Sequence, residues 1–166
     1  MIRLLGVDLG ERQIGLAIAD GDGGRAMPLA TVKRSGDDAA EIAALRRIVA
    51  EQQVEELVVG LPLEASGGEG PQAAITRAWI KAVGGRVGVR VTLRDERLTS
   101  HLAEQRVGPM KRGRSGGPPT RSQREAYRAR IDREAAAIIL QDELDARLAA
   151  SANPSTAHPG DHHEPR

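Results

Sequence analysis

The spacing of apolar residues changes after the first three predicted strands, and the change restricts the folds open to this chain. Residues 3–9, 14–19 and 27–32 are apolar or alternate in polarity, which predicts three strands joined by the turns 10–13 and 20–24. From residue 42 onward apolar residues recur at helical spacing, at Ile42, Leu45, Ile48 and Val49, and Asp37 or Asp38 can serve as the N-cap. Three hairpin-linked strands are therefore followed by a helix.

The rest of the chain predicts alternating strands and helices. Residues 56–60 have the unbroken apolar character of an interior parallel strand, and residues 87–93 alternate as a fifth strand. Pro71 can begin a helix between them. We expect the inward face of that helix to comprise Ile75, Ala78, Trp79, Ala82 and Val83.

Two more helices are predicted near the C-terminus. Thr99 or Ser100 can cap a helix of about two turns. Ser122-Gln123-Arg124-Glu125 matches a capping box and predicts the start of a long Ala-rich helix that ends near residue 150.

This order of elements predicts an α/β fold. Three antiparallel strands followed by β-α units give a mixed five-stranded sheet with helices on both faces, which is the order of the ribonuclease H-like fold. The 166 residues suit one domain, which we place at residues 1–150 with a flexible basic loop at 108–121. Residues 151–166 are polar and predict a disordered tail.

The composition excludes several classes of function. Binding of nucleic acid by base stacking on an open face needs several aromatic residues, and with no Phe, one Trp and one Tyr this mode is nearly excluded. The absence of Cys rules out thiolate catalysis, disulfides and Cys-ligated zinc. The N-terminus lacks the pattern of a signal peptide, and no apolar run approaches the ~20 residues of a membrane helix. We therefore expect a soluble, cytoplasmic protein with no membrane partner.

Asp8 is out of place in the first predicted strand. Aspartate is depleted in strands, and a carboxylate in an apolar sheet is costly unless a donor, a basic group or a metal pairs with it. Bracing of the turn at Gly10 is the plainest alternative, although Asp8 precedes that turn and lies within the strand.

Two further acids are candidates to meet Asp8. Glu96 follows the apolar part of the fifth strand, and Asp132 lies on the last helix, on a stripe that also contains Ala136 and Ile139. Crowded carboxylates repel one another, and a divalent cation resolves the conflict; oxygen ligands favour Mg²⁺ or Mn²⁺. We predict that Asp8, Glu96 and Asp132 are both metal ligands and catalytic residues. Alternatively, Glu96 pairs with Arg94 or Arg97 and Asp132 pairs with Arg128.

Other carboxylates remain open as members of this site. Glu64 stands near the end of the fourth strand, in a Gly-rich segment that is a weak candidate for phosphate binding, and Glu11 follows the first strand.

The stretch from Arg106 to Arg133 is strongly basic. It holds nine Arg and Lys residues against Glu125 and Asp132 alone. A solvated charge run is the usual meaning of such a segment, but its position beside Asp132 favours an arm that binds nucleic-acid phosphates. The residues that we predict to contact nucleic acid are Arg12, Arg97, Lys111, Arg112, Arg114, Arg121, Arg124 and Arg128.

Four ordered blocks resemble the YqgF family, also called RuvX. They are residues 8–20, beginning Asp8-Leu9-Gly10; residues 58–63 with 68–73; Asp95-Glu96-Arg97-Leu98-Thr99-Ser100; and residues 131–141, beginning Ile131-Asp132-Arg133. The resemblance implies a ribonuclease H-like fold and metal-dependent phosphodiester cleavage, with the family's acids at Asp8, Glu96 and Asp132. Glu11 and Gln13 depart from the pattern, since the family more often has Thr and Arg there.

The resemblance leaves the substrate open. The leading hypothesis is an endonuclease with Mg²⁺ or Mn²⁺ that processes the 5′ end of pre-16S rRNA during ribosome biogenesis. One alternative is a Holliday junction resolvase acting on branched DNA in recombination and repair, which would require a homodimer to cut two strands symmetrically. Another is a non-catalytic RNA-binding assembly factor. A sugar-kinase or actin-like ATPase ranks last, because it needs two lobes.

Overall fold

The computed structural model describes residues 2–97, 99–113 and 115–153. The elements in chain order are β1 (Arg3–Leu9), β2 (Gln13–Asp20), β3 (Met27–Lys33), α1 (Asp38–Gln52), β4 (Glu56–Pro62), α2 (Pro71–Ala82), the 3₁₀ turn η1 (Gly84–Arg86), β5 (Arg90–Glu96), α3 (Thr99–Val107) and α4 (Arg121–Ala152). The last helix ends at Ala152, close to the predicted end near residue 150. Of the predicted tail, residues 154–166 lie outside the described residues.

The five strands form one mixed sheet in the order β3-β2-β1-β4-β5. β1 pairs antiparallel with β2, and β2 with β3, whereas β4 runs parallel to β1 and β5 runs parallel to β4. The predicted fold class is therefore confirmed. The parallel strands β1, β4 and β5 end at the same edge of the sheet.

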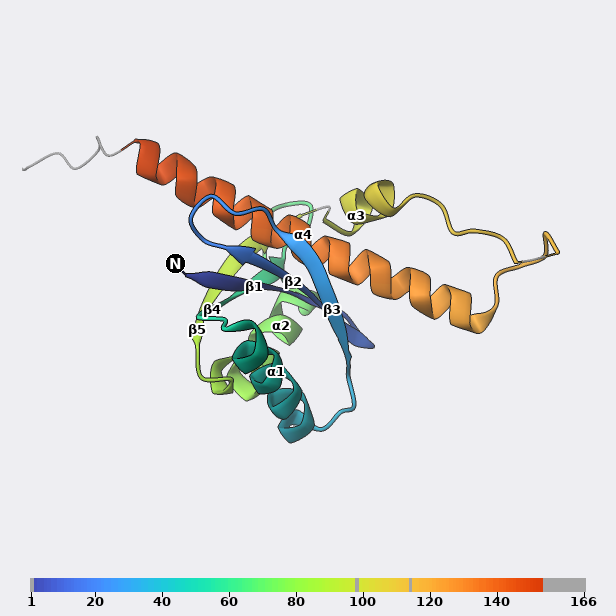
Figure 1. Cartoon of the computed structure of the whole chain (residues 1–166), viewed down its shortest axis with the longest axis horizontal. Helices are drawn as coiled ribbons and strands as arrows, with labels where there is room; N and C mark the ends of the chain where they lie inside the picture. The colour runs from blue at the N-terminus through green and yellow to red at the C-terminus, as the bar shows by residue number, and fades with distance from the viewer. Residues whose placement is uncertain (1, 98, 114, 154–166) are drawn as a thin grey trace, which may run out of the picture.

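Helices cover both faces of the sheet (Figure 1). Leu5 and Val7 of β1 belong to the larger core, which also contains Leu45 of α1 and Trp79 of α2. Leu4, two positions before Gly6, belongs to a second core with residues of α4. Since side chains alternate along a strand, the even-numbered positions of β1 face α4, and Asp8 is one of them.

The register of α2 differs from our prediction. Its buried residues are Ala73, Thr76 and Trp79, while Ile75 is 49% exposed. Ala78 is also exposed. Thr76 can be buried because its hydroxyl donates to the carbonyl of Gln72 at 3.1 Å, so its polar group is satisfied within the helix. The fifth strand starts at Arg90 and not at residue 87, because residues 87–89 bend, with Gly88 at a positive φ of 97°.

The start of α4 also lies elsewhere than predicted. The capping box is formed by Thr120 and Gln123: the Gln123 amide donates to the Thr120 hydroxyl at 3.2 Å, and the Thr120 amide donates to the Gln123 side chain at 2.8 Å. Ser122 and Glu125 lie within the helix, where Glu125 accepts from Arg121 at 3.0 Å. The preceding loop therefore ends one residue earlier than expected.

An ion-pair network fixes α4 against the sheet near the C-terminal end of the helix. Glu56 of β4 is 3% exposed and accepts hydrogen bonds from Arg147 of α4 and from Thr92 of β5. The hydrogen bond from Arg147 is the main cause of the lowered pKa of Glu56. This contact ties the C-terminal part of α4 to β4 and, through Thr92, to β5.

Candidate active site and nucleic-acid interface

Asp8 and Asp132 are brought together by a glycine. Asp8 pairs in register with Gly15 of β2. A β-carbon at Gly15 would collide with the backbone of Asp132 and would lie 3.0 Å from the amide nitrogen of Arg133. Because Gly15 has no side chain, α4 rests directly on β2 at the position beside Asp8.

Asp132 is held by a neutral partner. One of its carboxylate oxygens accepts a hydrogen bond from the Gln13 side-chain amide at 2.8 Å. Burial raises the pKa of Asp132, although Gln13, Arg128 and Arg133 act to lower it. No ion pair joins Asp132 to Arg128 among the described residues, so that plainer interpretation is not borne out by the geometry.

Glu96 is the last residue of β5, and its carboxylate lies over β4. One oxygen occupies the space where a β-carbon at Gly60 would stand. Burial is the main cause of the raised pKa of Glu96; a hydrogen bond with Thr99 opposes it, and the charge of Asp142 adds to it. Arg94 pairs instead with Glu143 at 3.6 Å.

The pKa of Asp8 is strongly raised. Burial, the charge of Glu96 and the charge of Asp132 all raise its pKa, from 3.8 to about 8. The Gly10 turn is closed by its own backbone, since the Gly10 amide donates to the carbonyl of Gln13 at 3.0 Å. The turn therefore does not need Asp8 as a brace, and Asp8 is an acid destabilised by desolvation and by two neighbouring charges.

The three acids do not form a closed ligand cage. Within the residues that the structure describes, no three Asp, Glu, His or Cys side chains lie close enough to hold a metal ion as they stand. Glu11 and Glu64 are exposed, and neither is among the charges that shift the pKa of Asp8. The site consists of three neighbouring carboxyl groups at one edge of the sheet, and the pKa of each is raised.

Four of the predicted nucleic-acid contacts lie around one hollow, which we call the basic cleft. One cavity of about 260 Å³ is lined by Arg12, Arg121, Arg124, Glu125 and Arg128. A second of about 230 Å³ shares most of these residues and adds Gln13 and Lys33. Gln13 also holds Asp132, so the basic cleft adjoins the acids. Lys33 was not among the predicted contacts, because it lies at the end of β3, far in sequence from the basic stretch between Arg106 and Arg133.

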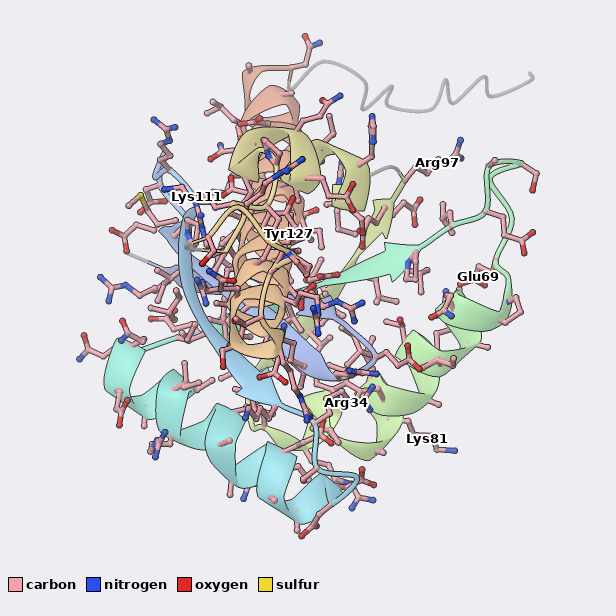
Figure 2. All side chains as sticks on the ribbon, turned by 90° about the vertical axis from the view of Figure 1, so that its right-hand side faces the viewer. Arg34, Glu69, Lys81, Arg97, Lys111 and Tyr127 are labelled. Carbon is pink, nitrogen blue, oxygen red and sulfur yellow. The ribbon has the colours of Figure 1, made fainter. Side chains whose placement is uncertain are left out.

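The other predicted contacts are dispersed. Lys111 lines a different cavity, beside Tyr127. Arg112 is exposed on the loop before α4. The Arg97 guanidinium lies against Gly67 of the Gly-rich segment, 2.6 Å from the position of a β-carbon there, and Figure 2 shows Arg97 well apart from Lys111. Arg114 lies outside the described residues.

A family model described as RuvX, Holliday junction resolvase, matches residues 2–146. The chain belongs to the RuvX family. A RuvX relative from Chloroflexus aggregans, named "Putative pre-16S rRNA nuclease", is 42% identical over 144 residues, which are 87% of this chain and 94% of the relative. One from Anaeromyxobacter dehalogenans with the same name is 42% identical over 146 residues, covering 88% and 98% of the two chains.

A solved structure supports the fold of this RuvX chain. Thermus thermophilus RuvC in complex with a Holliday junction substrate aligns with a TM-score of 0.53 over 90% of this chain and 97% of RuvC, at 16% identity. At that identity the likeness concerns the fold, which is ribonuclease H-like. No helix among the described residues is both long and apolar enough to cross a membrane.

Proposed function

We propose that this RuvX chain is a divalent-metal-dependent endonuclease that cuts phosphodiester bonds in structured RNA, with the precursor of 16S rRNA as its substrate in the cytoplasm. The observation that carries the proposal is Asp8. A half-buried carboxylate whose pKa is raised to about 8 by desolvation and by the charges of two further acids is costly for the fold. Such perturbed groups gather at functional sites.

The donor set fits Mg²⁺ or Mn²⁺. Asp8, Glu96 and Asp132 supply only oxygen ligands, and a cation between them would relieve the repulsion that raises the pKa of Asp8. A bound ion of this kind supplies a water of lowered pKa and stabilises charge on the phosphate. Since the three side chains do not form a closed cage by themselves, binding requires small side-chain adjustments.

The protein's own residues orient the acids. The Gln13 amide directs one oxygen of Asp132, and Thr99 does the same for Glu96. Both partners are neutral, so they fix direction without neutralising the carboxylates.

The basic cleft is suited to the phosphates of the substrate. Its cations come from the ends of two strands and from α4; they include Arg12, Lys33, Arg124 and Arg128. The one acid that lines the cleft, Glu125, is paired with Arg121. Phosphate contacts of this kind fix the register of a nucleic acid on a protein without reading its sequence. A nucleic-acid backbone bound in the cleft would lie beside Asp132, on the side where Gln13 contacts it.

Names of the RuvX relatives favour a ribosomal RNA precursor. The family description favours junction resolution as the second candidate, which would require two copies of the chain.

The test is cleavage by the wild type and by Asp8→Asn, with Mg²⁺ or Mn²⁺, of precursor rRNA and a four-way DNA junction in parallel. We expect metal-dependent cutting of the RNA that Asp8→Asn and Glu96→Gln abolish. Asp95→Asn, an exposed neighbour on the same strand, is the matched control and should cut normally. Cutting of the junction alone would transfer the proposal to the resolvase, and binding without cutting would favour an assembly factor.

A further inference from the structure

A second cavity beside α4 has walls of a different kind from the basic cleft. It measures about 410 Å³, within the range of ~300–1,000 Å³ that small-molecule sites occupy. Its lining comes from the loop after α3 and from the first turns of α4: Val107, Pro109, Met110, Lys111, Gln123, Ala126, Tyr127 and Arg130. We call it the Tyr127 pocket.

Tyr127 is fixed as one wall of this pocket. Its hydroxyl donates to the carbonyl of Gly108 at 2.7 Å, which ties α4 to the loop. The ring is the chain's only tyrosine and is half-buried. Since the hydroxyl is satisfied by the protein, the ring is held in one place beside Pro109 and Met110.

Two cations stand at the rim. Lys111 and Arg130 are exposed, and neither is in an ion pair with another described residue. Figure 2 shows Lys111 and Tyr127 on the same side of the molecule, along the α4 side. An aromatic wall can stack against a flat ring, and two cations at the rim can bind a phosphate joined to that ring. The pocket therefore suits a ligand that carries both groups.

The Tyr127 pocket and the basic cleft lie on opposite sides of the same stretch of α4. At 3.6 residues per turn, positions 121, 125 and 128 share one side and positions 123, 126 and 130 share the other. In this stretch the helix projects beyond the sheet, with the loop running back alongside it (Figure 1). Tyr127 precedes Asp132 by five residues, a rise of ~7.5 Å along the axis.

We propose that the Tyr127 pocket receives a single unpaired nucleobase of the bound RNA, stacked against Tyr127, while Lys111 and Arg130 hold its flanking phosphates. The inference rests on the proposed function only in requiring that the chain bind nucleic acid. It gives the protein a way to recognise a bulge or an unpaired end on the side of α4 opposite the basic cleft. One enclosed base needs one aromatic ring, which suits a chain with so few aromatic residues.

The test measures binding in EDTA, so that nothing is cut, to an RNA duplex with one bulged adenosine and to the same duplex with an abasic bulge. Wild type should prefer the base by about 5- to 100-fold, as one stacked base contributes. Tyr127→Leu should bring the ratio close to one, while Tyr127→Phe should retain it. Lys111→Gln should weaken both complexes equally, and Lys81→Gln, an exposed lysine on α2, should change neither.

A second readout is independent of any substitution. Because the chain has one tyrosine, ring-labelled protein gives a single set of Tyr127 signals in NMR spectra. These signals should shift with the bulged adenosine and not with the abasic duplex.

Equal affinity for both duplexes with unmoved Tyr127 signals would overturn the pocket assignment, even if metal-dependent cleavage is found. Failure to bind any RNA would overturn the pocket and the proposed function together. Cleavage lost in Asp8→Asn with base preference intact would support the pocket separately.

Discussion

The carboxylate of Glu96 lies over Gly60, in the space that a side chain at position 60 would fill. The same missing side chain leaves room for Ile139 of α4, whose terminal carbon lies 2.6 Å from the β-carbon position. Because Gly60 has no side chain, both Glu96 and α4 can pack against β4 at this position. The position connects the packing of the sheet to the placement of a proposed metal ligand.

Gly60→Ala should therefore reduce both stability and cleavage. Overpacking of this kind costs about 1–3 kcal/mol, and displacement of Glu96 should lower cleavage at least tenfold. Thermal unfolding and cleavage rates check the two effects. Gly117→Ala is the matched control, because nothing lies within 4 Å of its β-carbon position. Normal cleavage by Gly60→Ala would show that the position of Glu96 over Gly60 is irrelevant to the chemistry.

Asp8→Asn should stabilise the metal-free protein, and more so as the pH rises. Native Asp8 keeps its proton up to about pH 8, whereas the ordinary pKa is 3.8, so the native state binds more protons in between. Wild-type stability then falls as the pH rises through this interval, and the Asn variant lacks that loss.

The check is thermal unfolding in EDTA at several pH values. We expect the variant to unfold at least about 5 °C higher near pH 8, which corresponds to ~2 kcal/mol for a domain of this size, and by much less near pH 4. A difference that is constant with pH would mean that the pKa of Asp8 is not raised.

Mg²⁺ or Mn²⁺ should stabilise the wild type against heat. A ligand that binds only the native state at about 100 times its dissociation constant contributes ~2.7 kcal/mol. Asp8→Asn should lose most of the shift, and EDTA should reverse it in the wild type. KCl at matched ionic strength, added to both proteins, distinguishes a general ionic effect from binding at the acids. Equal metal-induced shifts in wild type and variant would remove Asp8 from the ligand set.

Gln13→Leu should lower cleavage without preventing folding. The substitution removes the hydrogen bond at 2.8 Å that orients Asp132. Partners that orient metal ligands typically contribute 10- to 100-fold to activity or metal affinity. The concentration of Mn²⁺ needed for half-maximal cleavage should rise, while RNA affinity in EDTA should stay close to that of the wild type. An unchanged Mn²⁺ requirement would show that Gln13 does not act through Asp132.

The substitutions Arg124→Gln and Arg128→Gln should each lower the affinity for RNA. Each should also make that affinity less sensitive to salt concentration. Each lost phosphate contact should reduce the slope of log affinity against log salt by ~0.7–0.9. Arg47→Gln is the control, since Arg47 lies on α1 on the opposite face of the sheet and pairs with Glu51. If the RNA contacts the whole basic cleft, Lys33→Gln should reduce the affinity and the salt slope as Arg124→Gln and Arg128→Gln do. Slopes equal to that of the wild type would place the nucleic acid elsewhere.

Part of this site could be predicted from the sequence, because one of its residues is unusual for its local secondary structure. Aspartate in an aliphatic strand is costly wherever the strand is buried, so Asp8 could be selected without coordinates. The order of strands and helices likewise follows from apolar spacing, and it specified the mixed sheet. Local patterns were ambiguous where two registers fit equally: Thr120-Arg121-Ser122-Gln123 and Ser122-Gln123-Arg124-Glu125 both match a capping box, and the first is formed.

What only the tertiary structure decided is proximity. Gly15 and Gly60 look ordinary in the sequence, yet their lack of side chains lets α4 and Glu96 approach Asp8. Gln13 departs from its family's pattern, and its bond to Asp132 spans 119 residues of chain. Local propensity depends on near neighbours, whereas the pKa of Asp8 depends on charges that folding brings from β5 and α4. The sequence by itself determined which acid was anomalous, and packing decided which residues surround it.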